Sequence, residues 1–372
     1  MDIARKFKPH TIFLWQPVAD HPEAARIISM FPTAKIELIG HQRMPPGENI
    51  SAGQALVKSK RTLMIGQSTS FVGNFDGGLG SSVRCCPYHK LVPLSNGCPY
   101  YCTYCYLAIV YRKFSPFIKL NINYETMFRQ IKKAAAKCSG PADFNMGEML
   151  DSLALDHITG LTVKLVPFFE NIPNAHLMLL TKSANIDNLL SIPSGRHTVV
   201  SWSLNNQHAI DNYEFGTASL AQRLTAAKKC QEHGYRIRFR IDPGILHRDW
   251  KNAYSDMVSQ ALTAVTPENI TLGMLRMLPG HKKLATAAYR KNSASLTRQR
   301  LTQKNSDGKL RYPHANRIEF YKHVIGCIKS YNSRVTISLC RETPDVWQAM
   351  KNLCRPGDCN CVNKSTHATT LF

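Results

Sequence analysis

The sequence predicts an α/β protein with a partial (β/α)6 barrel of the TIM type, a small α/β domain before it and a cysteine-rich tail after it. From about residue 91, short apolar runs alternate with stretches of helical length and periodicity. Repeated strand-then-helix units favour right-handed crossovers and a parallel sheet. Five or six such units suit a partial barrel better than an eight-stranded one. We expect active-site groups at the carboxyl ends of the strands.

The small N-terminal domain is expected to cover residues 1–84. Its strands, its helix and a glycine-rich linker are expected, in chain order, at 11–15, 22–30, 35–39, 62–65 and 74–82.

The barrel is expected to cover residues 85–340, and the tail residues 341–372. Strands are expected at 143–146, 176–180, 198–204, 236–241, 270–275 and 335–339. Helices are expected at 124–136, 157–169, 185–190, 218–233, 252–265 and 315–330.

Composition narrows the class of protein. The first thirty residues carry charges and prolines at intervals, and nowhere do eighteen apolar residues follow one another, so we expect no signal peptide and no membrane span. A cytoplasmic location follows as an expectation. Twelve cysteines in a long chain from a reducing compartment indicate metal or redox chemistry and not disulfides.

The chain is strongly basic. Its formal net charge of +22 creates a field that attracts phosphate backbones, which makes nucleic acid the leading partner. A basic protein that is merely soluble is the alternative. Positive charge is dense between residues 281 and 311, a candidate phosphate-contacting surface. Its cations are Lys282, Lys283, Arg290, Lys291, Arg298, Arg300, Lys304, Lys309 and Arg311.

The segment from residue 97 to 107 holds three cysteines, Cys98, Cys102 and Cys105, in the spacing C-x3-C-x2-C. Three thiolates on a short loop can each bind one iron of a 4Fe-4S cluster and leave the fourth iron open for a ligand. A zinc site, or a set of buried cysteines without metal, is the alternative. The aromatic spacers and the position before a strand-helix series favour the cluster.

This loop resembles that of radical S-adenosylmethionine (SAM) enzymes. The resemblance implies that the open iron binds SAM and that one electron from the cluster cleaves it to methionine and a 5'-deoxyadenosyl radical. An electron donor such as flavodoxin or ferredoxin is then expected as a partner, and no membrane.

The chain is also similar to the spore photoproduct lyases, radical enzymes that reverse a thymine dimer in DNA. The similarity extends over roughly three hundred residues, which makes an accidental motif match unlikely. It rests on the cluster loop and on the segments 21–32, 58–65, 181–182, 201–205, 214–217, 234–243 and 311–312.

The resemblance implies roles for individual residues. Cys98, Cys102 and Cys105 would ligate the cluster, Tyr104 and Lys182 would contact SAM, and Tyr106 would lie near the radical path. Ser201, Ser203 and Asn205 would lie near the ribose or the methionine end. A hairpin with Arg311 and Tyr312 would enter the DNA. Each of these residues also has a purely structural interpretation, such as a buried hydroxyl or a solvated strand end.

The sequence departs from the family at the position of the hydrogen-donating cysteine, and this difference bears on which reaction the protein catalyses. The lyases donate a hydrogen atom from a cysteine at the end of the second barrel strand, where this chain has Glu148. The segment Met146-Gly147-Glu148 instead looks like the Gly-Glu element with which other radical SAM enzymes bind the amino group of the cofactor. Asp151 and Asp156 are candidate acid-base residues, with helix-starting or surface roles as the alternative.

Six of the other nine cysteines form a second set of candidates. Cys354, Cys359 and Cys361 form a C-x4-C-x-C tail, with Cys340, Cys85 and Cys86 as possible companions. They are a second metal site, an alternative hydrogen donor or inert, because the sequence does not close the set of ligands.

Three hypotheses follow for function. The first is a radical enzyme that modifies or rearranges a thymine-derived base in DNA, of the isomerase or hypermodification type. The second is a photoproduct lyase whose hydrogen donor comes from elsewhere in the chain. The third is a non-enzymatic, metal-dependent module that binds nucleic acid.

Overall fold

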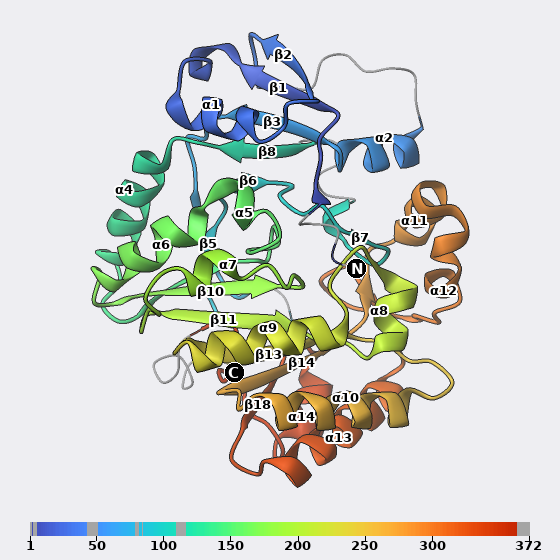
Figure 1. Ribbon diagram of the computed structural model, residues 1–372. Coiled ribbons are helices and arrows are strands. Elements are labelled where there is room, and N and C mark those ends of the chain that lie inside the picture. Colours follow the sequence, from blue (N-terminus) through green and yellow to red (C-terminus); the bar gives the residue numbers. More distant parts are fainter. Residues whose placement is uncertain are drawn as a thin grey trace.

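The computed structural model describes residues 2, 6–42, 51–78, 82–83, 85–108 and 117–362. Two sheets organise this part of the chain, and Figure 1 shows the smaller one at the top with the larger one below it. Two further pieces of sheet hold only two or three short strands each.

The smaller sheet has five strands, of which four run parallel and β6 runs antiparallel to β8. In spatial order they are β2 (Lys35–Ile39), β1 (Thr11–Trp15), β3 (Thr62–Gly66), β8 (Ile118–Asn121) and β6 (Leu94–Ser95). The central strand β3 is buried along its whole length, as expected for an apolar run covered on both faces. The helices of this region are η2 (Gln16–Val18), α1 (Pro22–Ser29) and α2 (Ala52–Ser59).

The larger sheet has eight strands, and all but the edge strand β4 run parallel to their neighbours. In spatial order they are β18 (Thr336–Leu339), β14 (Asn269–Met274), β13 (Arg236–Gly244), β11 (Thr198–Ser203), β10 (Ala175–Thr181), β9 (Ala142–Met146), β5 (Tyr88–Leu91) and β4 (Val72–Phe75). Parallel neighbours need crossover connections, and helices supply them.

The connecting helices pack their apolar sides against this sheet. Trp202 in β11 and Phe239 in β13 are completely buried beneath them. A capping box between Ser219 and Gln222 starts α9. In chain order the helices are α4 (Tyr124–Ala135), α5 (Asp156–Thr159), α6 (Leu161–Glu170), α7 (Asp187–Leu190), α8 (Gln207–Tyr213), α9 (Leu220–Glu232), α10 (Trp250–Ala264), α13 (His314–Tyr331) and α14 (Pro344–Met350).

The remaining elements lie beside the carboxyl ends of the large sheet. Strand β7 (Tyr101–Cys102) pairs antiparallel with β12 (Glu214–Phe215). The antiparallel strands β15, β17 and β16 are Arg276–Met277, Leu310–Arg311 and Gln303–Lys304. Between β15 and β16 the chain forms α11 (His281–Tyr289), η3 (Arg290–Ser293) and α12 (Ala294–Thr297), at the right of Figure 1.

All nine strands predicted from the sequence are confirmed, with ends that differ by no more than three residues. The predicted helix 157–169 is two helices, because Gly160 between them has a left-handed backbone with φ of 58°. Part of the predicted linker 74–82 belongs to β4, and residues 79–81 lie outside the described part of the chain. Helices α2, α8 and α11 and strand β8 were not predicted.

Strands on both sides of residue 84 enter both sheets, since β6 and β8 complete the small sheet while β4 joins the large one. The chain is therefore a mixed α/β protein with parallel sheets. The strands that the structure describes form no closed barrel, because β18 and β4 are the two edges of the large sheet. Among the described helices, none has the length and the apolar character that a membrane crossing requires.

Candidate functional site

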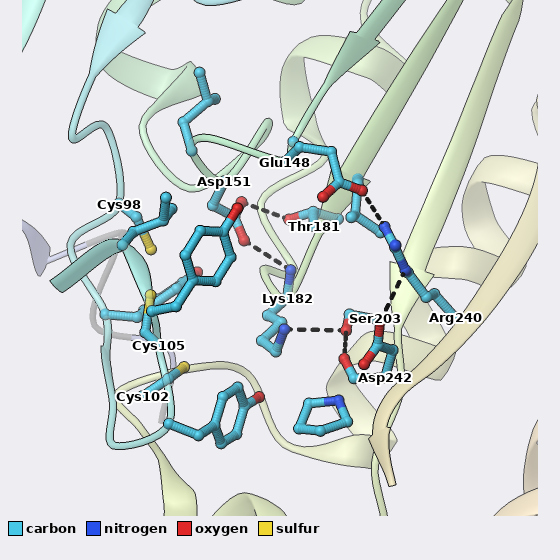
Figure 2. A pocket seen from close by; sticks show the side chains of 18 of the residues that line it. Cys98, Cys102, Cys105, Glu148, Asp151, Thr181, Lys182, Ser203, Arg240 and Asp242 are labelled. Carbon is cyan, nitrogen blue, oxygen red and sulfur yellow. Dashed lines mark hydrogen bonds and ion pairs between the residues drawn. The ribbon is translucent and has the colours of Figure 1, made fainter. Parts of the chain in front are cut away.

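A cavity of about 320 Å³ lies at the carboxyl ends of the parallel strands of the large sheet. One wall is the cysteine loop, and the opposite wall consists of residues at, or directly after, the carboxyl ends of β9, β10, β11, β13 and β14. Figure 2 shows the three cysteines on one side of this space and Glu148, Arg240 and Asp242 on the other. The position is the one that parallel α/β sheets give to active sites.

The thiols of Cys98, Cys102 and Cys105, here called the loop thiols, all line this cavity. Lys60 donates to the carbonyl of Cys98 at 2.6 Å, and the Thr103 backbone N–H donates to the Tyr213 carbonyl at 2.8 Å, so the loop is held at its first cysteine and beside its second.

The spacing of the loop thiols suits a cluster. Their sulfur atoms do not all come within 4.8 Å of one another, as thiols bound to different irons require. Burial raises the pKa of the Cys98 thiol to about 12 and also raises that of Cys102. A bound metal is therefore needed to stabilise the thiolates.

Tyr104, Lys182 and Ser203 meet at the floor of the cavity. Lys182 Nζ donates to Ser203 Oγ at 3.0 Å and lies 5.9 Å from the centre of the Tyr104 ring. The Tyr104 hydroxyl donates to Glu214, which forms a fully buried ion pair with Arg223 at 2.6 Å. The structure thus brings together three of the residues that the sequence assigned to the cofactor.

Glu148 faces the cavity, and Gly147 before it packs closely against Leu180 of β10. A Cβ on Gly147 would lie 2.4 Å from Leu180 Cβ, so no other residue fits there. The Glu148 carboxylate pairs with the buried guanidinium of Arg240 through Oε1. Burial alone would raise the pKa of Glu148, but Arg240 outweighs it and the pKa is lowered. Among the described residues, the other oxygen, Oε2, accepts no hydrogen bond, so it remains available to a cationic ligand.

Asp151 also lines the cavity, yet its oxygens are occupied. They accept hydrogen bonds from the backbone N–H groups of Leu153, Ala154 and Lys182 and from the Thr181 hydroxyl, at 2.7 to 3.1 Å. Its pKa is raised because burial outweighs these bonds. Asp151 thus fixes the loop after β9 to the end of β10.

Asp156 lies away from the cavity and binds the Thr162 backbone N–H at 2.9 Å and the Asn188 amide at 3.1 Å. Asp156 begins α5, as the helix-starting alternative predicts, whereas the surface role is wrong for both acids because both are buried.

Several charged residues of the cavity wall were not predicted from the sequence. Asp242 pairs with Arg276 at 2.8 Å, and its pKa is lowered because Arg276 outweighs the effect of burial. Arg240, Lys309 and Arg341 line the same space. The sequence did contain a signal for these residues, because every second residue from Arg236 to Asp242 is charged. Charged residues at the carboxyl end of a buried strand are unusual without a function.

Two residues assigned to the cofactor by resemblance do not line the cavity. The Ser201 hydroxyl is buried and accepts a hydrogen bond from the Asn360 amide at 2.5 Å. Asn205 is completely buried, where it accepts from the Tyr254 hydroxyl at 2.8 Å and donates to the Pro243 carbonyl at 2.9 Å. Both side chains position neighbouring strand ends.

The basic segment lies against the cysteine loop. The ring of His281 is 2.8 Å from the Thr103 carbonyl, and Tyr289 packs edge-on against Tyr101. Lys283 and Arg290 are exposed on α11 and η3. Lys282 is half-buried, and its ammonium binds the carbonyls of Thr297 and Gln299.

Arg311 and Tyr312, expected on a hairpin that enters DNA, are both buried. Arg311 forms an ion pair with Asp307 at 2.7 Å, and the Tyr312 hydroxyl donates to Gln299. Their neighbour Lys309 does reach the cavity, where its ammonium lies 4.8 Å from the centre of the Tyr106 ring. Burial, aided by Arg276 and Arg341, lowers the pKa of Lys309 to about 8.

Comparisons with known proteins agree with this geometry. The family model described as spore photoproduct lyase matches residues 7–338. The spore photoproduct lyase of Clostridium acetobutylicum is 26% identical over 248 residues, which are 65% of this chain and 70% of that protein. The enzyme of Bacillus subtilis is 25% identical over 270 residues, which are 71% of this chain and 75% of that protein.

Solved structures of spore photoproduct lyase share the fold. A cysteine-to-alanine mutant with dinucleoside spore photoproduct has a TM-score of 0.77 and 20% identity, covering 90% of this chain and 98% of the other. A double mutant with bound AdoMet and dinucleoside spore photoproduct has a TM-score of 0.75 and 21% identity over the same shares. With the family model matched over most of its length, the chain belongs to the spore photoproduct lyase family, a family of radical SAM enzymes that use a 4Fe-4S cluster and SAM.

Proposed function

We propose that this enzyme acts on a thymine-derived base in DNA, and that the splitting of a spore photoproduct is its leading candidate reaction. One observation carries the proposal: three loop thiols open onto a cavity that Lys182, Ser203 and Glu148 also line, in a chain of this family. The relatives are spore photoproduct lyases, and one solved structure of that fold holds both AdoMet and a dinucleoside spore photoproduct. Membership of an enzyme family sets aside the non-enzymatic module.

The residues present fit the two cofactors. Cys98, Cys102 and Cys105 would hold the cluster, and the adjacent cavity would take SAM. Together the cofactors supply a carbon radical that removes a hydrogen atom from the substrate. The chain's own part is to bind and orient. Lys182 and Ser203 offer hydrogen bonds to polar groups of SAM, and Glu148, kept ionised by Arg240, offers a carboxylate oxygen to its ammonium group.

The DNA would approach from the side of α11, η3 and β16. This assignment is supported by the position of the segment, because exposed cations border the loop that carries the thiols. Phosphate contacts of this kind position DNA without reading its sequence. The exposed cations of the segment are Lys283, Arg290, Lys291, Arg298, Arg300 and Lys304. The electron would come from a small carrier such as flavodoxin or ferredoxin.

The six parallel strands from β9 to β18 would form the partial barrel that the sequence predicts. Their neighbours in space follow chain order, and the helices between them are the crossovers. That arrangement brings the ends of all six strands towards one side of the sheet, where the cavity lies.

A second candidate reaction is the modification or rearrangement of a thymine-derived base. The position of Glu148 favours it, because the resemblance places the hydrogen-donating cysteine of the lyases there, and a carboxylate has no weakly held hydrogen atom to give. On the sequence alone, this reaction ranked first. The comparisons support repair at least as strongly, since every relative named above is a lyase.

One experiment separates the two reactions. Protein reconstituted without oxygen is incubated with SAM, a reductant and either spore photoproduct DNA or undamaged thymine DNA, and the nucleosides are analysed by mass spectrometry. Repair predicts that two thymines replace each photoproduct. Modification predicts a new nucleoside from the thymine DNA and an unchanged photoproduct. Reconstituted protein that leaves SAM and both DNAs intact would refute the proposed function.

A further inference from the structure

A second group of cysteines lies behind the wall of the cavity. The thiols of Cys85, Cys359 and Cys361 lie within 4.8 Å of one another, although Cys85 is more than 270 positions from the other two in the sequence. Cys340 lies beside Cys85 and Cys359, outside the 4.8 Å spacing that the other three thiols share. We call Cys85, Cys340, Cys359 and Cys361 the buried thiol cluster.

The remaining cysteines nearby are set apart by their contacts. Cys354, in the same tail, points its thiol to the Met350 carbonyl within the hydrophobic core. Cys86 lies outside the close trio, and its thiol is directed to the Gly357 carbonyl at 3.8 Å. Three of the six thiols thus share the close spacing, and Cys340, whose thiol lies 2.9 Å from the Arg240 guanidinium, is taken as the fourth.

The backbone of the tail is fixed to the large sheet at several points around these cysteines. Arg238 in β13 donates to the carbonyls of Asn360 and Val362, at 3.1 and 2.7 Å. Thr271 Oγ1 in β14 accepts from the Asn360 N–H at 2.8 Å, and the Ser201 hydroxyl in β11 accepts from the Asn360 amide at 2.5 Å. Three strands therefore hold the two thiols that flank Asn360 in fixed positions.

Two guanidinium groups lie beside the buried thiol cluster. The Arg240 guanidinium lies 2.9 Å from Cys340 Sγ, and Arg341 interacts electrostatically with Cys85 and Cys340. Two carboxylates are nearby, and both already pair with Arg240: Glu148, whose Oε1 is 3.8 Å from Cys361 Sγ, and Asp242. Four thiolates around a divalent cation carry an excess of negative charge, which buried guanidinium groups offset.

We propose that Cys85, Cys340, Cys359 and Cys361 bind a single structural metal ion of the zinc class, separate from the cluster on the loop thiols. Tetrahedral zinc with thiolates at about 2.3 Å places the sulfur atoms about 3.8 Å apart, within the spacing of this trio. Thiols bound to separate irons of a cubane stand farther apart, as the loop thiols do. Four protein ligands leave no open position, so the ion has a structural role.

The ion would support the cavity wall. Cys340 and Cys361 contact Arg240 and Glu148, and these two residues face the cavity on their other side. A metal that joins the tail to β18 and to the segment before β5 thereby fixes the Glu148–Arg240 pair in place.

The test uses the full chain with the loop thiols removed. A Cys98→Ala/Cys102→Ala/Cys105→Ala variant is purified without oxygen, loaded with Zn²⁺ or Co²⁺ alone, desalted and analysed for metal. We expect about one ion per chain and, for Co²⁺, thiolate charge-transfer and tetrahedral absorption bands. This variant leaves the tail unchanged, so the result does not depend on the folding of a tail mutant.

Additional substitutions in that background identify the ligands. Cys359→Ala should lose the ion, and Cys340→Ala should lose most of it. Cys354→Ala, the matched control from the same tail, and Cys86→Ala should keep it. The absence of bound Zn²⁺ and Co²⁺, retention of the ion by Cys359→Ala, or an iron-sulfur spectrum in the triple variant would each overturn the proposal. All of these readouts are independent of the reaction of the enzyme on DNA.

Discussion

The two groups of cysteines in this molecule differ in how the chain assembles them. The loop thiols come from eight consecutive residues, line a cavity and stand well apart. The buried thiol cluster comes from three distant parts of the chain and is closely packed behind the cavity wall. A local spacing is visible in the sequence, whereas a site built by tertiary contacts is visible only after folding.

The two groups are connected through a single pair of side chains. Glu148 and Arg240 face the cavity that the loop thiols line, and they also contact Cys361 and Cys340. One group would thus supply reactivity and the other would fix the wall opposite to it. Substitutions in the two groups and in the connecting pair should therefore have different consequences.

The largest effect is expected from the loop thiols. Cys102→Ala should reduce cluster iron and reductive SAM cleavage to background, because two thiolates do not hold the cubane with an open iron. Cys138→Ala, which removes a thiol outside both groups, should retain both properties. Iron content and 5'-deoxyadenosine formation measure the outcome. Full cleavage activity in the Cys102→Ala protein would show that the loop thiols do not hold the cluster.

The next largest effect, on the free energy of unfolding, is expected from the Glu148–Arg240 pair, which connects the two groups of cysteines. Arg240→Met leaves the Glu148 carboxylate buried without its partner, so the free energy of unfolding should fall by about 3–5 kcal/mol. Lys228→Met on α9 breaks an exposed pair with Glu232 and should cost about 0.5 kcal/mol or less. Denaturant titration of both variants gives the comparison. Equal losses would show that the Glu148–Arg240 pair contributes no more than an exposed ion pair does.

The sequence predicted more of the fold than of the site. All the predicted strands were found because parallel strands that are covered on both faces have near-continuous apolar runs. The loop thiols were predicted from their local spacing, and Lys182 was predicted from the resemblance to the family. Arg240 was missed because its neighbours Glu148 and Cys340 are 92 and 100 positions away. Arg311 was expected on the DNA surface, and only tertiary packing shows that Asp307 pairs with it in a buried position.

A sharper test of the cavity wall is Glu148→Gln, which keeps the shape of the side chain and removes its charge. SAM binding should weaken by about ten- to hundredfold, the range for a hydrogen bond to a charged group. Glu125→Gln on the surface of α4 should leave the affinity unchanged. Anaerobic equilibrium dialysis with reconstituted protein measures both. An unaltered affinity in Glu148→Gln would remove Glu148 from the cofactor site.

A smaller effect, on DNA affinity, is expected from the basic segment. This segment, unlike the buried thiol cluster, borders the outer face of the cysteine loop. Lys283→Glu with Arg290→Glu should reduce the slope of log affinity against log salt by about one for each phosphate that the protein no longer neutralises. Lys228→Glu with Lys229→Glu on α9 should preserve the slope. Lys282 is left unchanged, because its ammonium already binds the carbonyls of its own segment. Identical slopes for the two double variants would place the DNA elsewhere.

The smallest effect concerns Lys309, the cation at the mouth of the open site. Its pKa of about 8 means that the ammonium is charged at neutral pH and neutral at pH 9. If it contacts a phosphate, DNA affinity should fall about fivefold across this range, which corresponds to about 1 kcal/mol from one hydrogen bond. Lys309→Met should remove this step, and Lys304→Met, an exposed lysine nearby, should keep it.

The stability of the protein should respond to pH in the opposite direction. The folded-state pKa of Lys309 lies below its ordinary value of 10.5, so between pH 8 and 10.5 the unfolded chain holds a proton that the folded chain has released. The free energy of unfolding should therefore gain a contribution that rises with pH across this window. Lys309→Met should lack that contribution. If affinity and stability instead fall together in the unmodified protein, a group other than Lys309 titrates, and the mouth of the cavity carries no pH-sensitive cation.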